Sequence, residues 1–123
     1  MNIFLVEDSS AVRERLADML RAIPGAKLVG EASHAEPAIR AILAARPAVV
    51  MLDLGLAEGS SGFEVLRAVH PQAPEIDFYM LSNFSAEPYR QLARRLGACR
   101  FFDKSKELEC VRELIAQRAA ARP

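Results

Sequence analysis

The chain lacks several features that would place it in a specialised class. It has no tryptophan and only two cysteines, Cys99 and Cys110, among 123 residues. These cysteines form neither a CxxC motif nor a Cys/His cluster, so we expect no structural zinc site and two buried, reduced thiols. An excess of charge is absent too, because 16 basic and 16 acidic residues cancel to a formal net charge of zero. That balance argues against direct binding of nucleic acid, which usually requires a basic excess or stripe.

Long hydrophobic runs, repeats and flexible linkers are also missing. The N-terminal apolar run, residues 3–6, is far too short for a signal peptide or a membrane span, and no basic segment precedes it. We therefore expect a cytoplasmic protein without membrane insertion. With 51% hydrophobic and 26% charged residues and no Pro/Gly/Ser-rich linker, residues 1–123 are predicted to form one globular domain.

The chain does contain a regular alternation of short apolar runs and segments with helical spacing. The apolar runs lie at 3–6, 28–29, 49–54, 78–81 and 101–102. Between them, apolar residues three or four apart predict helices, of which the first covers 12–23 and stops at Pro24-Gly25. Serines mark the expected starts of the other four helices: Ser33 and Ser61, each with a capping-box glutamate three residues later, then Ser85 and Ser105. The fourth helix is expected to end at Gly97, and the apolar stripe of the fifth near Ile115.

Five strands alternating with five helices predict a parallel sheet, because parallel neighbours need crossover connections and helices supply them. The central runs are continuously apolar, as expected of strands that are covered on both faces. We therefore predict an α/β fold, a three-layer doubly wound domain. The pattern by itself leaves the strand order open.

Polar residues stand at the ends of these runs, where open α/β sheets bind their ligands. Glu7 and Asp8 follow the first run, Ser82 ends the fourth, and Lys104 closely follows the fifth. Asp8 has an ordinary alternative role, as the cap of the first helix. Asp53 lies inside the third run, where an unpartnered charge would be costly. Crowded carboxylates stay ionised only beside a cation or donor, and Mg²⁺ is the natural candidate.

The set Glu7, Asp8, Asp53, Ser82 and Lys104 resembles, in order and approximate spacing, the signature of response-regulator receiver domains, the CheY-like family. The resemblance covers essentially the whole chain and implies a five-stranded parallel sheet of order 2-1-3-4-5. It further implies a two-component phosphorelay protein that receives a phosphoryl group from a sensor histidine kinase or a histidine phosphotransfer protein. Such a domain acts on a downstream protein target, unknown here, and catalyses only its own phosphorylation and dephosphorylation.

The resemblance also implies residue roles. Asp53 is similar to the phosphoacceptor, Lys104 to the lysine that pairs with it and then with a phosphoryl oxygen, and Ser82 to a hydroxyl that binds another phosphoryl oxygen. The implied Mg²⁺ ligands are the side chains of Glu7 (largely through water), Asp8 and Asp53 and the backbone carbonyl of Gly55.

A switch is implied as well, in which Ser82 moves toward the phosphoryl group and Phe101 turns inward. The surface of the fourth helix, fifth strand and fifth helix would then change its affinity for a partner. The alternative is that Phe101 is a static core residue. Four arginines near the fourth helix (Arg90, Arg94, Arg95 and Arg100) form either a solvated face or a surface for an acidic partner.

Three features of the sequence differ from the usual family pattern. Ser105 replaces the proline that usually follows the lysine, and because a cis bond to a non-proline residue costs about 3 kcal/mol, we expect a trans bond there. The segment 55–62 lacks the usual proline and is one residue longer, so we expect a more mobile approach to Asp53. Gly55 and Phe84 flank the site, and shielding by Phe84 predicts slow hydrolysis of the aspartyl phosphate.

Two other functions compete with phosphoryl acceptance. A pseudo-receiver would use the same fold as a phosphorylation-independent interaction module, but it has no physical reason to keep both the acid pair and Lys104. A hydrolase with a nucleophilic aspartate needs a second acid two residues later, where Gly55 stands. No Gly-rich nucleotide-binding loop follows the first strand. The sequence leaves open the oligomeric state and whether the domain stands alone or belongs to a longer protein.

Overall fold

The computed structural model describes residues 1–83 and 86–121, in which strands and helices alternate along the chain. The strands are β1 (Asn2–Val6), β2 (Lys27–Ala32), β3 (Val49–Leu52), β4 (Asp77–Ser82) and β5 (Arg100–Asp103). The α-helices are α1 (Ser10–Arg21), α2 (Ala35–Ala45), α3 (Gly62–Val69), α4 (Glu87–Arg95) and α5 (Leu108–Ala120), and a short 3-10 helix, η1 (Ala57–Gly59), precedes α3. The predicted alternation is confirmed.

The strands form one parallel sheet of order β2-β1-β3-β4-β5, which confirms the order implied by the family resemblance. Val6 at the end of β1 pairs with Leu52 at the end of β3, and Ser82 pairs with Asp103 at the ends of β4 and β5. From β1 the strand order continues to β2 on one side, and from β3 it continues to β4 and β5 on the other. The topological switch point therefore lies beyond the carboxyl ends of β1 and β3.

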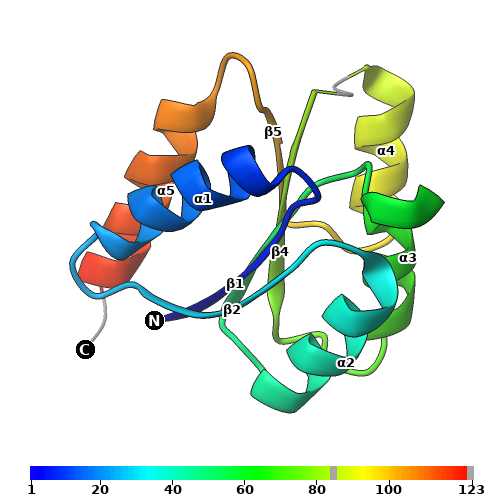
Figure 1. The fold of residues 1–123 in the computed structure, drawn as a ribbon, viewed down its shortest axis with the longest axis horizontal. Coiled ribbons are helices and arrows are strands. Elements are labelled where there is room, and N and C mark those ends of the chain that lie inside the picture. The colour runs from blue at the N-terminus through cyan, green and yellow to red at the C-terminus, as the bar shows by residue number, and fades with distance from the viewer. Residues whose placement is uncertain (84–85, 122–123) are drawn as a thin grey trace.

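Helices cover both faces of the sheet, with α1 and α5 on one side and α2, α3 and α4 on the other (Figure 1). Alternate strand residues serve the two layers: Ile3 and Leu5 pack toward α1 and α5, whereas Phe4 and Val6 pack toward the opposite helices. Each fully buried side chain of this size contributes about 1.5–3 kcal/mol relative to exposure. Burial on both faces explains why β3 reads as four consecutive apolar residues.

The starts of α1 and α2 differ from the expectations. Ser9, not Asp8, caps α1, and its hydroxyl accepts a hydrogen bond from the Val12 N–H. The predicted capping box at Ser33 is wrong, because His34 occupies the cap position of α2. The His34 side chain forms no capping hydrogen bond. The hydroxyl of Ser60, from the loop after β3, accepts instead from the Ala35 N–H at 3.1 Å.

Of the other predicted helix boundaries, the start of α3 and the end of α4 are confirmed, whereas both ends of α5 differ from the expectation. The capping box of Ser61 and Glu64 at the start of α3 is confirmed in both of its hydrogen bonds. Gly97 ends α4 with φ of +110°, and a Cβ there would lie 2.4 Å from the His70 ring, so only glycine fits. Ser85 lies outside the described residues. The fifth helix begins at Leu108 rather than Ser105, and it continues past Ile115 to Ala120.

The loop of residues 55–62, expected to be mobile, is anchored by backbone hydrogen bonds. The Leu56 N–H donates to Ser60 at 3.0 Å, and the Ala57 N–H donates to the Ser33 carbonyl, also at 3.0 Å. The turn is made in η1, where Glu58 and Gly59 have φ values of +59° and +73°. The loop is thereby attached to the start of α2.

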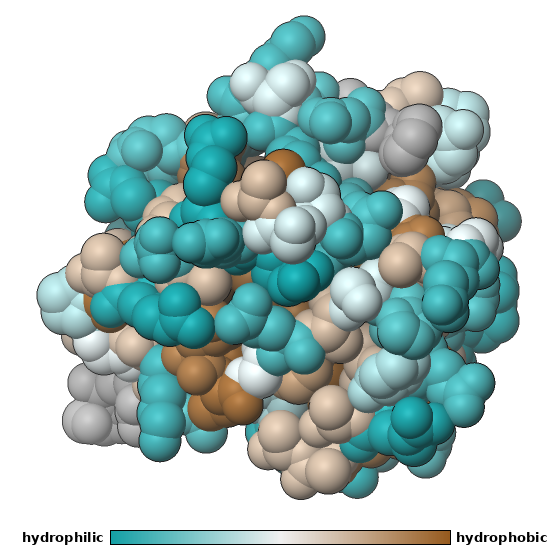
Figure 2. Space-filling model, viewed as in Figure 1, coloured by the Kyte–Doolittle hydropathy of each residue, from teal (hydrophilic) through white to brown (hydrophobic). Residues whose placement is uncertain are grey.

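The surface mixes hydrophilic and smaller hydrophobic areas on the face drawn in Figure 2.

Cys99 and Cys110 are both exposed and form no disulfide with each other, so the prediction of buried thiols is wrong. Among the described residues, no helix is both long and apolar enough to span a membrane.

Candidate functional site

The carboxyl edge of the sheet gathers most of the polar residues singled out in the sequence. Glu7 and Asp8 follow β1, Asp53 follows β3, Ser82 ends β4 and Lys104 follows β5. Because β1 and β3 are neighbours, the three acids meet even though 45 residues separate Asp8 from Asp53 in the numbering. Glu7, Asp53 and Ser82 are buried, whereas Asp8 is exposed.

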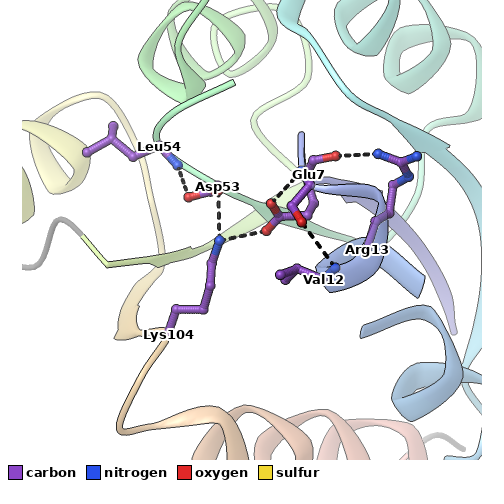
Figure 3. Close-up of polar contacts among 7 residues, drawn as sticks. Glu7, Val12, Arg13, Asp53, Leu54 and Lys104 are labelled. Carbon is purple, nitrogen blue, oxygen red and sulfur yellow. Dashed lines mark hydrogen bonds and ion pairs between the residues drawn. The ribbon is translucent and has the colours of Figure 1, made fainter. Parts of the chain in front are cut away.

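Lys104 joins the two buried carboxylates, as Figure 3 shows. Its Nζ donates to Glu7 Oε1 at 2.7 Å and to Asp53 Oδ2 at 2.8 Å. Burial lowers the pKa of Lys104, but the hydrogen bonds to Asp53 and Glu7 outweigh it, so this pKa lies above the ordinary value for lysine. The ammonium therefore stays charged while it spans the two acids.

Glu7 is held in a nearly dry position. Its side chain is 2% exposed, and Oε2 accepts a hydrogen bond from the Ser9 N–H at 3.1 Å. The Arg13 guanidinium donates to the Glu7 carbonyl at 2.8 Å and so ties α1 to this strand end. Burial raises the pKa of Glu7 above its usual value, and the Asp53 charge adds to this, against the lowering hydrogen bond from Lys104. A further cation beside Glu7 would favour its ionised form.

Hydrogen bonds to both carboxylate oxygens orient the Asp53 side chain. Its Oδ1 accepts from the Leu54 N–H at 2.7 Å, while Oδ2 is the atom bonded to Lys104. The start of α3 packs closely against it, because a Cβ on Gly62 would lie 2.3 Å from the Asp53 carbonyl oxygen. Glycine at this position therefore allows the start of α3 to pack against the backbone of Asp53.

The acidic groups fit a hard divalent cation. One carboxylate oxygen each from Glu7, Asp8 and Asp53 lies within 4.8 Å of the others. Three carboxylates against one ammonium leave a net negative charge, and oxygen donors of this kind suit Mg²⁺. With Ser9 capping α1, the Asp8 side chain is not needed for the helix, so its helix-cap alternative is wrong. Gly55 forms a bridge with Ser61 beside the cluster, and its carbonyl as a ligand stays a prediction.

The loop after Lys104 takes the expected trans form, since the described residues contain no cis peptide bond. Asp103 organises this loop: its Oδ1 accepts from the Ser105 N–H at 2.9 Å and from the Ser105 hydroxyl at 2.6 Å. Glu107, which the sequence analysis missed, accepts from the Asp103 N–H at 2.8 Å. The only sequence signal was its spacing four residues after Asp103, which is too common to single it out.

The residues expected to form the switch occupy different environments. Ser82 is fully buried at the end of β4, and its carbonyl accepts from the Lys104 N–H at 3.0 Å. Phe101 is half-buried in β5, with the Arg90 guanidinium 4.9 Å from its ring centroid. Phe84, expected to shield the site, lies outside the described residues.

A family model for the response regulator receiver domain matches residues 3–116. The chain belongs to this family. It is therefore a receiver domain of two-component response regulators, as the strand-end residues indicated. The chain is 31% identical to the DNA-binding transcriptional activator DevR/DosR of Mycobacterium tuberculosis, an alignment that covers 98% of this chain and 60% of the relative. It spans 47% to 60% of the length of the first curated relatives that it matches.

Solved structures share the fold. The response regulator domain of Thermotoga maritima CheB superimposes with a TM-score of 0.83 at 25% identity, covering 100% of this chain and 98% of that one. CheY of Borrelia burgdorferi, solved in a CheX–CheY–BeF3–Mg²⁺ complex, gives a TM-score of 0.80 at 20% identity over 93% of this chain and 88% of that chain. The second likeness shows the fold alone.

Proposed function

We propose that this domain accepts a phosphoryl group on Asp53 and changes its partner-binding surface in response. The observation that carries the proposal is the position of Lys104, whose ammonium lies 2.8 Å from Asp53 Oδ2 and 2.7 Å from Glu7. A buried carboxylate beside a fixed cation, at the switch point of a doubly wound sheet, suits transfer of a negatively charged group. Membership of the receiver family supports the same role.

The transfer asks little covalent chemistry of the protein. An Asp53 carboxylate oxygen forms a bond to phosphorus while the P–N bond of a donor phosphohistidine breaks, and the leaving imidazole nitrogen keeps the electron pair. The Leu54 N–H, bonded to Oδ1, holds the carboxylate in a fixed orientation. Lys104 passes from the carboxylate to a phosphoryl oxygen, where it neutralises the spread negative charge.

Mg²⁺ is the proposed cofactor, and it would supply the positive charge that brings the phosphoryl group to a cluster of acids. Glu7, Asp8 and Asp53 are the side chains that would hold it, with the Gly55 carbonyl as a further ligand. Carboxylate and carbonyl oxygens are the donors that Mg²⁺ prefers, and this supports the choice of metal. Ser82 would bind a phosphoryl oxygen, and Phe101 would turn inward as Ser82 moves.

The proposed partners are a sensor histidine kinase or histidine phosphotransfer protein as donor and a downstream protein as target. We place the domain, 1–123, in the cytoplasm, without direct contact to nucleic acid, and regard it as a phosphoacceptor rather than an enzyme acting on other substrates. The alternative is a pseudo-receiver, which nothing in the site specifically favours. Its phosphorylation-independent binding would make no use of the Lys104 bridge.

Intact mass after incubation with acetyl phosphate and Mg²⁺ tests the proposal. We expect one added phosphoryl group on the native chain and on the control Asp18→Asn, which changes an exposed acid on α1. We expect none on Asp53→Asn or when EDTA replaces Mg²⁺. A native chain that stays unmodified while another receiver is phosphorylated in the same tube would establish the pseudo-receiver instead.

A further inference from the structure

A hollow of about 310 Å³ lies between α4 and β5, at an edge of the sheet. Its lining includes three arginines, Arg90 and Arg94 from α4 and Arg100 from β5, together with Cys99 and Phe101. We call this hollow the arginine pocket. Of the residues assigned to phosphoryl transfer and switching, only Phe101 contributes to its wall.

Arg90 is a fixed part of that wall. Its Nη1 donates to the Phe101 carbonyl at 3.2 Å, and its guanidinium lies 4.9 Å from the centroid of the Phe101 ring. It also pairs with Glu107 at 3.6 Å, so much of its charge is balanced. Arg90 thus shapes the pocket and ties it to the strand that carries Phe101.

Arg94 and Arg100 differ from Arg90 in having unbalanced charge. Both are exposed, and neither forms an ion pair with any residue in the described part of the chain. Arg94 stands in the last turn of α4, where a cation stabilises the helix dipole. That explanation does not extend to Arg100, which comes from a strand. Two like charges that face one hollow repel each other unless an anion lies between them.

We propose that the arginine pocket binds an acidic peptide segment of a partner protein, with carboxylates held by Arg94 and Arg100. Planar guanidinium groups match carboxylates in geometry and form strong, charge-assisted hydrogen bonds with them. A formal net charge of zero gives the domain no extended basic field for nucleic acid, whereas a local pair of arginines is enough for a short acidic segment.

The proposal deepens the proposed function, because it rests on this face being the partner-binding surface and adds the chemistry of the partner. It does not rest on phosphorylation, since the pocket is present while Asp53 is paired with Lys104. Phe101 connects the two sites: turning inward, it would remove one wall of the pocket and release Arg90 from its ring.

The test is a titration of the full, ¹⁵N-labelled chain with N-acetylated hexaglutamate, without any phosphodonor, followed through the arginine Nε–Hε signals. We expect the largest shifts at Arg94 and Arg100 and none with hexaglutamine. The double variant R94Q/R100Q is expected to weaken hexaglutamate binding by at least about tenfold. The matched control R15Q/R67Q removes two exposed arginines from α1 and α3 and is expected to retain the native affinity.

Several outcomes would overturn the proposal. Equal weakening in both double variants would mean general charge attraction, and absence of binding at millimolar peptide would remove the site. Tighter binding of a single-stranded oligothymidylate at the same arginines would make the ligand a nucleic acid. Self-association of the native chain that is lost in R94Q/R100Q would make the occupant a second copy. Failure of phosphorylation in the mass assay, by contrast, leaves this titration unaffected, so the two proposals fail separately.

Discussion

At the scale of single residues, the carboxyl edge of the sheet places three carboxylates around one ammonium. Lys104 neutralises part of this charge, but Glu7 is still so buried that its pKa lies above the usual value. Glu7 and Asp53 are both bonded to Lys104, whereas Asp8 is exposed and stands apart from that bridge. Asp8 is therefore the acid that can be changed with the least effect on the unliganded fold.

We predict that Asp8→Asn weakens Mg²⁺ binding without lowering stability in the absence of the ion. A ligand stabilises the folded state according to its affinity, so a tenfold loss of affinity removes about 1.4 kcal/mol of stabilisation at a fixed, high Mg²⁺ concentration. Thermal unfolding at increasing Mg²⁺ measures this, and Glu14→Gln, an exposed acid on α1, is the control. A Mg²⁺-dependent rise in Tm that is the same in Asp8→Asn and the native chain would contradict the role of Asp8.

At the scale of elements, the helix starts show what local sequence can and cannot predict. Ser61 and Ser33 carry the same pattern of a serine followed by a glutamate, yet only Ser61 forms the capping box. At α2 the loop after β3 approaches closely enough for Ser60 to supply the cap, 25 residues away in sequence. The hydroxyl of Ser33 lies against His34 Nδ1 instead, at 3.2 Å.

This difference predicts unequal effects of two serine substitutions. Ser60→Ala removes the acceptor for the Ala35 N–H and the hydroxyl bond to the Ala57 carbonyl, and we expect it to lower the free energy of unfolding by about 1 kcal/mol. Ser33→Ala, which removes no cap, is expected to change it by less than about 0.5 kcal/mol. Urea denaturation compares them. If Ser33→Ala proved the more costly, Ser33 rather than Ser60 would be supporting α2.

The same reasoning explains which parts of the site were predictable. The parallel sheet follows from the alternation of apolar runs and helical stripes, and its strand ends lead directly to Glu7, Asp53 and Lys104. Glu107 was missed because its role depends on how the loop after β5 folds back toward Asp103, which no periodic pattern records. Cys99 was expected to be buried from its residue type alone, but it lies in the exposed connection between α4 and β5.

At the scale of the whole molecule, the sheet divides the interior into two apolar layers. Ile42 of α2 belongs to one layer and Ile115 of α5 to the other, and both are 0% exposed. The central strands contribute to both layers, because alternate side chains of β1 and β3 point in opposite directions. The two layers are thus joined through the strand backbones but are built from separate clusters of buried side chains.

We predict that Ile42→Val and Ile115→Val destabilise the domain additively in a single unfolding transition. Each substitution removes one buried methylene and is expected to cost about 0.5–1.5 kcal/mol. Since the two sites contact different side chains, the double variant should equal the sum within about 0.5 kcal/mol. Ile42→Val combined with Val65→Ala, two residues of the same layer, is the comparison expected to show non-additive destabilisation.

Urea denaturation monitored by circular dichroism and by tyrosine fluorescence measures the free energy of unfolding of each variant and the number of unfolding transitions. Two separate transitions would contradict the prediction that residues 1–123 fold as one domain, and strong coupling between Ile42 and Ile115 would mean that the strands transmit packing strain across the sheet.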